Sequence, residues 1–179
     1  MCPSLSNVKK FIYAALWHSL FRARWSNQIH EEWIASVLKR HTNLKRESLI
    51  LIRDLMNSSI LDALIENYQT LIPSIALPDP KDAHVLAAAI HAKVSTIITF
   101  NLKDFPESEL EKFDIEAQHP DEFVSHLLDL SEPLVLATLK SLRESLQKPP
   151  YSAVELIQKL EICNLPKSCQ LIRKNILNI

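Results

Sequence analysis

The chain has 179 residues, of which 47% are hydrophobic and 23% charged, and its formal net charge is −1 at pH 7. This composition is typical of a soluble globular protein and excludes intrinsic disorder, a coiled coil and an integral membrane protein. The sequence contains no glycine. Because the P-loop and the dinucleotide-binding fingerprint both need glycine where backbone approaches phosphate, both are excluded, and a nucleotide cofactor is not expected.

The three cysteines, Cys2, Cys163 and Cys169, have no CxxC spacing, which predicts reduced thiols and neither a disulfide framework nor a zinc site. The apolar run "FIYAALW", residues 11–17, is short, and the basic segment "FRARW" follows it in place of a small-residue cleavage site. This pattern does not predict a secretion signal. We therefore expect a cytoplasmic protein.

The first third of the chain has the pattern of three helices. Ser6 or Asn7 can cap a helix that ends near residue 20. Asn27 can cap a second helix, "QIHEEWIASVLKRH", whose apolar residues cluster on one side. A third helix is expected over about residues 45–57.

The middle of the chain alternates between helix and strand. A short strand at about residues 62–66 precedes a helix expected over residues 80–93. The segment "STIITF", residues 95–100, is apolar throughout, which favours a strand covered on both faces in a parallel sheet. A second parallel strand is expected at "FDIEAQ", with "HPDEFVSHLL" as the helix after it. This alternation predicts an α/β fold.

The last part of the chain has a different character. From Ser131 onward the pattern predicts three helical stretches, separated by "KPP" and "NLP". Ser152 and Glu155 have the spacing of a capping box at the start of one of them. We therefore expect an α/β domain in residues 1–130 and a helical C-terminal extension in residues 131–179.

The expected helix at residues 80–93 opens with an unusual density of charge, "LPDPKDAH". Asp79 occupies the position of an N-cap, Pro80 the first helical position, and Asp82 the first turn. One interpretation is structural, because an acid in the first turn interacts favourably with the helix dipole. The other is that Asp82 binds a ligand at the start of the helix.

A second polar group follows the strand expected at residues 95–100. Asn101 and Asp104 come at its carboxyl end, where open α/β sheets place their sites. If the start of the next helix lies at this edge, Asp82, Asn101 and Asp104 can offer oxygen ligands to one cation such as Mg²⁺. The alternative is a simple turn at Asn101 and Asp104. By themselves, Glu31 and Glu32 are most simply part of a solvated helix face.

Three stretches together resemble consecutive blocks of the PIN-domain family. In chain order they are "WSNQIHEEW", "LPDPKDAHVLAAAIHAKVSTIITFNLKDFP" and "IEAQHPDEFVSHLL". This family comprises metal-dependent nucleases and includes the VapC-type toxins of bacterial toxin–antitoxin pairs. The resemblance covers most of the chain, and it implies a three-layer α/β/α sandwich around a parallel sheet, followed by the helical extension.

The resemblance also implies a site and an activity. Glu32 matches the helix glutamate of the family, Asp82 the acid at the next helix start, and Asn101 a position often occupied by aspartate, with Asp104 as a neighbouring fourth ligand. These four residues are the implied catalytic and metal-binding residues for one or two Mg²⁺ or Mn²⁺ ions. The implied function is a ribonuclease that cleaves RNA, with a small antitoxin protein as partner, a homodimer as a further assembly, and no membrane association.

The sequence departs from the family pattern at its start. Members of the family begin with an apolar strand that ends in an aspartate, whereas the resemblance here begins after that strand, and no acid precedes Glu31. A longer reading frame, a strand from another chain or a rearranged sheet would each account for this. A second hypothesis is therefore a catalytically impaired PIN-like remnant that only binds protein or RNA. A third treats the C-terminal helices as a DNA-binding or dimerising module.

Overall fold

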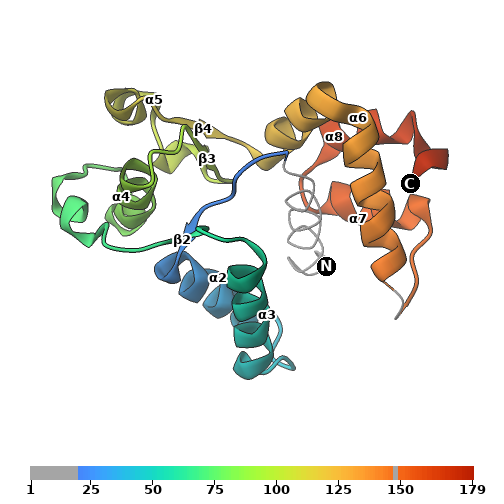
Figure 1. Ribbon diagram of the computed structural model, residues 1–179, viewed down its shortest axis with the longest axis horizontal. Coiled ribbons are helices and arrows are strands. Elements are labelled where there is room, and N and C mark those ends of the chain that lie inside the picture. Colours follow the sequence, from blue (N-terminus) through green and yellow to red (C-terminus); the bar gives the residue numbers. More distant parts are fainter. Residues whose placement is uncertain (1–19, 147–148) are drawn as a thin grey trace. The chain divides into compact units, whose positions relative to one another are not determined.

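The computed structural model describes residues 20–146 and 149–179 (Figure 1). The helix predicted for the first 20 residues lies almost entirely outside this range. The described chain forms two compact units. The α/β unit is Ala23–His119, and the helical unit is Pro120–Ile179 together with residues 20–22. In the described ranges, none of the helices combines the length and the apolar character that crossing a bilayer requires.

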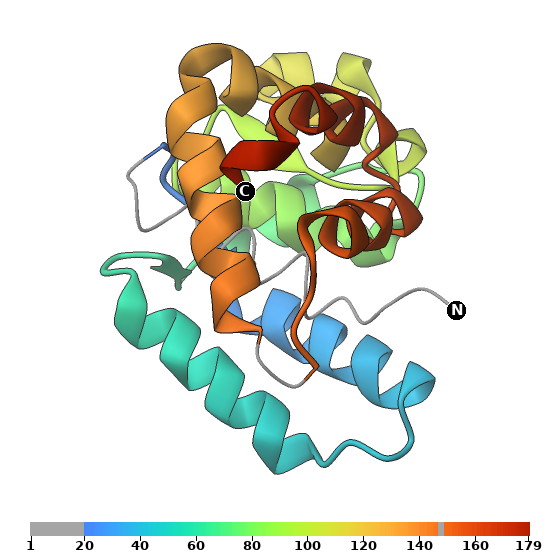
Figure 2. The same cartoon turned by 90° about the vertical axis from the view of Figure 1, so that its right-hand side faces the viewer.

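Two antiparallel helices form one part of the α/β unit. Helix α2 (Asn27–Arg40) and helix α3 (Arg46–Ser59) lie side by side, as Figure 2 shows. Both helices were predicted from the sequence. The cap of α2 is Ser26 rather than Asn27, because the Ser26 hydroxyl accepts a hydrogen bond from the Ile29 amide at 3.2 Å. Both residue types are good caps, so the pattern could not separate two adjacent candidates.

The strands of the described chain are short and parallel. Strand β1 (Trp25–Ser26) pairs with β2 (Leu64–Ile65), and β3 (Thr96–Ile98) pairs with β4 (Glu116–Gln118). The α/β class, the parallel pairing and the helical C-terminal region are confirmed. The described strands form two separate two-stranded sheets instead of one continuous sheet. Strand β1 was not predicted, because two residues are too short to give a periodic signal.

Helix α4 (Ala83–His91) is the central helix of the α/β unit, and the 3₁₀ turn η2 (Pro80–Asp82) leads into it. One side of α4 packs with Leu86 and Ala89 against Ile97 of β3. On another side, Ala87 and Ala88 pack against a cluster that includes Ile65 of β2. Because alanine side chains are small, the helix backbone approaches both sheets closely. The start of α4 is thereby fixed relative to the end of β3.

The helical unit consists of α6 (Pro120–Ser145), α7 (Ala153–Ile162) and α8 (Pro166–Arg173), which pack together in Figure 1. Helix α6 is kinked at Ser131, which has non-helical backbone angles two residues before Pro133. The boundary expected near residue 130 falls at this kink, and the division of the chain into domains there stays a prediction. The capping box of Ser152 and Glu155 is confirmed.

Two cysteines of the helical unit, Cys163 and Cys169, are buried and form no disulfide with each other. The Cys169 thiol lies 3.6 Å from the Ile157 carbonyl oxygen in the shared core of α7 and α8. Burial is the main cause that raises the pKa of Cys169 to about 12. Cys169 is therefore a neutral core residue at neutral pH, without the thiolate character of a reactive cysteine. Cys2 lies outside the described residues.

A buried aspartate joins the first turn of α6 to the start of α8. The two carboxylate oxygens of Asp121 accept hydrogen bonds from the Lys167 and Ser168 amides, both at 2.8 Å. In return, the Ser168 hydroxyl donates to the Asp121 carbonyl oxygen at 2.8 Å. Asp121 thus caps the start of α8, although the two amides that donate to it lie 46 and 47 positions later in the chain.

Substitution of Asp121 by alanine removes this cap and leaves two amides at the start of α8 without their acceptor. We expect the free energy of unfolding of the helical unit to fall by about 1–3 kcal/mol. Urea denaturation followed by circular dichroism measures the change. Glu122→Ala is the matched control, because Glu122 is an exposed acid in the same turn. Equal losses for both variants would contradict the capping role.

Candidate metal centre

Three carboxylates of the α/β unit converge on one point. Carboxylate oxygens of Asp79, Asp82 and Asp104 all lie within 4.8 Å of one another, and all three residues are half-buried. Asp79 is the N-cap of η2, and Asp82 is the last residue of that turn. Asp104 ends the 3₁₀ turn η3 (Leu102–Asp104), which follows β3. The start of the α4 segment and the carboxyl end of β3 therefore meet, which is the arrangement that the family resemblance implied.

Asp79 and Asp82 differ in what their side chains do for the helix. The Asp79 carboxylate accepts a hydrogen bond from the Lys81 amide at 2.9 Å and so caps η2. Asp82 occupies the N-cap position of α4, but its side chain makes no capping hydrogen bond. The structural interpretation of the charged helix start therefore holds for Asp79. Capping does not explain why an aspartate stands at position 82.

Asn101 contacts the cluster through Asp104. The Asn101 side-chain amide donates a hydrogen bond to the Asp104 carboxylate, and the Asp104 backbone amide donates to the Asn101 carbonyl oxygen at 3.2 Å. The turn that the sequence allowed at these residues is thus present, together with the juxtaposition to Asp82. In this orientation the Asn101 amide nitrogen orients the Asp104 carboxylate, and the role of Asn101 as a cation ligand stays a prediction.

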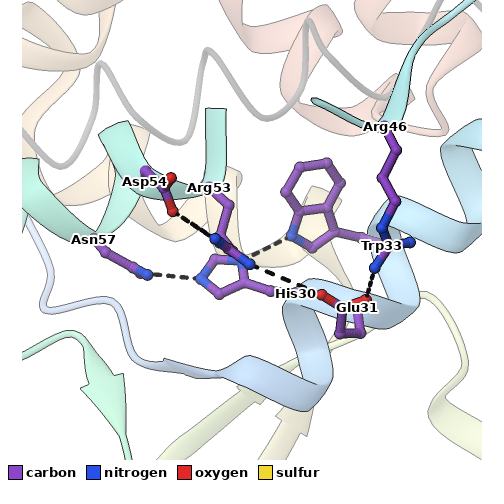
Figure 3. Close-up of polar contacts among 7 residues, drawn as sticks. All are labelled: His30, Glu31, Trp33, Arg46, Arg53, Asp54 and Asn57. Carbon is purple, nitrogen blue, oxygen red and sulfur yellow. Dashed lines mark hydrogen bonds and ion pairs between the residues drawn. The ribbon is translucent and has the colours of Figure 1, made fainter. Parts of the chain in front are cut away.

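The paired glutamates of α2 face different partners. Glu32 lies at the α4 side, where its Oε1 is 2.7 Å from Nε2 of His84. Glu31 pairs with Arg46 and Arg53 of α3, as Figure 3 shows. Both glutamates are about half exposed, so the ion pairs of Glu31 contribute little to stability. Glu31 therefore belongs to the surface between two helices, and Glu32 belongs to the neighbourhood of the acidic cluster.

The acids of this neighbourhood repel one another. Burial is the largest cause that raises the pKa of Asp82, and the negative charges of Asp79, Asp104 and Glu32 raise it further. His84 acts in the opposite direction. A divalent cation would offset this repulsion, and carboxylate oxygens are the ligands that Mg²⁺ and Mn²⁺ prefer. The donor set thus fits a hard divalent cation.

Sequence reasoning missed two members of this arrangement. Asp79 was interpreted only as a cap, although its spacing of three residues from Asp82 is the signal that both carboxylates can face one side of a turn. His84 was not among the predicted site residues, and it is buried and bonded to Glu32. No local pattern could have identified Glu32 as its partner, because the two residues are 52 positions apart.

The orientation of α2 is set by a buried hydrogen-bond network around His30. Nδ1 of His30 accepts a hydrogen bond from the Trp33 indole at 2.9 Å, so Nε2 carries the hydrogen and donates to Oδ1 of Asn57 at 3.0 Å (Figure 3). The same Asn57 oxygen accepts from the Trp25 indole at 2.7 Å. The network ties α2, α3 and β1 together. Trp25 is buried in this network, and Trp33 is half-buried.

Comparison with known proteins extends this picture. The PIN domain family matches residues 2–103, more than half of the chain, and the VapC50 C-terminal domain family matches residues 120–174. A Mycobacterium tuberculosis protein named "Putative ribonuclease VapC50" is 39% identical over 80 residues. That segment covers 45% of this chain and 47% of the relative, so the likeness spans about half of each protein. No solved structure matches the chain.

Substitution of Asn57 by leucine removes the oxygen that the Trp25 and His30 side chains share. Because both donors are then left in the interior without this acceptor, we expect the free energy of unfolding to fall by about 1–3 kcal/mol. Urea denaturation monitored by tryptophan fluorescence gives this value. Ser58→Ala, an exposed change on the same helix, is the control and should leave stability within about 0.5 kcal/mol of the wild type.

Proposed function

Because the chain belongs to the PIN-domain family, we propose that it is a VapC-type ribonuclease that depends on a divalent cation. The observation that carries this proposal is the convergence of Asp79, Asp82 and Asp104 at the carboxyl end of β3, with Glu32 nearby. The cellular role that we propose is that of the toxin in a type II toxin–antitoxin pair.

In this proposal the cation is Mg²⁺ or Mn²⁺. Asp82 and Asp104 bind it together with Asp79, Glu32 completes the acidic surroundings, and Asn101 keeps the Asp104 carboxylate oriented. Glu32, Asp82, Asn101 and Asp104 are thus the proposed catalytic residues. A divalent cation in such a site activates water and stabilises the charge that develops on a phosphodiester during hydrolysis.

The proposed substrate is RNA. The M. tuberculosis relative is named a ribonuclease, and this chain shares 39% identity with about half of that protein. Two lysines beside the acidic cluster support a phosphate-bearing substrate. Lys81 and Lys103 are exposed neighbours in sequence of Asp82 and Asp104, and such charges attract a nucleic-acid backbone.

The proposed partner is a small antitoxin protein, and exposed apolar side chains of α3 support a protein partner. Leu51 and Leu55 are 65% and 64% exposed, are four positions apart and therefore lie on one face of the helix. Ile52 adds to the same region, and Leu61 just beyond the helix is 87% exposed. Exposed apolar groups of this kind favour a binding surface for another protein, either the antitoxin or a second copy of the chain.

Asp82→Asn keeps the shape of the side chain and removes its charge. We expect Mg²⁺-dependent cleavage of single-stranded RNA to fall by about 100-fold or more, because the proposed site loses a ligand that no cap hydrogen bond explains. Asp114→Asn is the control, since Asp114 is an exposed acid of the same unit in a left-handed conformation that asparagine tolerates. Its activity should equal that of the wild type.

Two other results of this assay would contradict the proposal. Equal residual cleavage by Asp82→Asn and the wild type would indicate a contaminating nuclease. A wild-type chain that binds RNA or a protein partner but shows no cleavage with Mg²⁺ or Mn²⁺ would favour the catalytically impaired remnant. Specific binding of duplex DNA by the chain would favour the third hypothesis, in which the C-terminal helices are the functional module.

Asp79→Asn separates capping from cation binding. Asparagine is as good an N-cap as aspartate, and the substitution relieves the repulsion between Asp79 and Asp82, so the unfolding temperature of the metal-free protein should not fall. The lost negative charge should weaken Mn²⁺ binding by about tenfold or more in isothermal titration calorimetry. Binding equal to that of the wild type would restrict the role of Asp79 to capping and remove it from the proposed centre.

A further inference from the structure

One buried side chain of α4 reaches the acidic neighbourhood from inside the protein. The His84 side chain is 2% exposed, whereas the Glu32 side chain that it contacts is 50% exposed. Their contact, Nε2 to Oε1, is 2.7 Å long and joins α4 to α2. A ring fixed in the core thus holds a carboxylate that would otherwise move freely at the surface.

The geometry of the contact places a hydrogen on Nε2 of the ring. An ionised carboxylate only accepts hydrogen bonds, so Nε2 of His84 carries a hydrogen and donates it to Glu32. Nδ1 is buried without a hydrogen-bond partner among the described residues. A buried polar atom without a partner is destabilising. Packing alone would favour an apolar residue at position 84, as at its buried neighbours Ala83 and Leu86.

We propose that His84 is a positioning residue, whose Nε2–H holds the Glu32 carboxylate beside the carboxylates of Asp79, Asp82 and Asp104. This inference rests on the proposed function, because it gives Glu32 its place in the cation site. His84 itself offers no atom to the cation, since its Nε2 is occupied by Glu32. Its effect is exerted through Glu32 alone.

Two anchors act on Glu32 in this arrangement. The first is His30, which lies two positions before Glu32 on α2. Its network with Trp33 and Asn57 fixes the rotation of α2. His84 then fixes the end of the Glu32 side chain, which has several rotatable bonds. Ordering the side chain before the cation arrives lowers the entropy lost on binding. Residues that orient metal ligands in this way commonly change metal affinity 10–100-fold when they are substituted.

Two variants of His84 form a matched pair. His84→Gln places an N–H donor close to the position of Nε2, whereas His84→Asn places its donor nearer the backbone, too far from Glu32 to reach it. In calorimetric titrations with Mn²⁺, we expect His84→Asn to bind about 10–100-fold more weakly than the wild type. His84→Gln should restore most of the affinity. Thermal unfolding of the metal-free variants establishes that both are folded.

A double-mutant cycle separates positioning from a general effect on the fold. If His84 acts through Glu32, His84→Asn should cause no further loss of Mn²⁺ affinity in a Glu32→Ala background, which offers no acceptor to Nε2. A loss of equal size in both backgrounds would overturn the proposal. So would equal Mn²⁺ affinities for the wild type, His84→Gln and His84→Asn, and in that case the proposed nuclease function would remain intact.

The metal-free protein provides a second readout. Long-range ¹H–¹⁵N NMR should show a hydrogen on Nε2 of His84, which exchanges slowly in the wild type and faster in Glu32→Ala. An Nε2 without a hydrogen, or exchange unaffected by Glu32→Ala, would overturn the proposal. By contrast, a wild-type chain that neither binds Mn²⁺ nor cleaves RNA, yet shows the slowly exchanging Nε2 hydrogen, would overturn the proposed function and the positioning role together.

Discussion

The burial of α4 is the constraint on which the rest of the α/β unit depends. Six of its nine residues are buried, and most of these are alanines that let the helix pack against both short sheets. This packing brings the turn before α4 to the end of β3, so Asp82 and Asp104 meet although they repel each other. The apolar packing of the helix thereby holds the two carboxylates close together, although their charges alone would drive them apart.

The same logic applies to the two buried histidines. His30 and His84 are both buried, and each ring is hydrogen-bonded to a side chain of another helix, Asn57 for His30 and Glu32 for His84. His30 satisfies both ring nitrogens and ties helices together, which is a structural role. His84 leaves Nδ1 without a partner among the described residues and binds a half-exposed carboxylate, which packing does not explain. The difference in hydrogen-bond satisfaction distinguishes a structural histidine from a candidate for function.

The sequence predicted the α/β class and the helices around the site, because strong local signals marked them, whereas the meeting of Asp82 with Asp104 was implied by the family resemblance. Pro80 fixed the start of the helix, and the continuous apolar run at β3 fixed the strand whose end carries Asp104. Strand β1, the capping of α8 by Asp121 and the Glu32–His84 bond were not predicted. Each depends on contacts between distant positions, which no local period records.

Because the chain has no glycine, other residues occupy the positions with left-handed backbone angles. Among the described residues, five positions have left-handed backbone angles, and four of them are aspartate or asparagine: Asp62, Asn67, Asp114 and Asn164, with Lys93 as the fifth. Glycine would adopt these angles with less strain, but it would also give the unfolded chain more conformations. A chain without glycine is stiffer when unfolded and loses less entropy on folding. The smaller loss of entropy favours the folded state of a unit whose strands are so short.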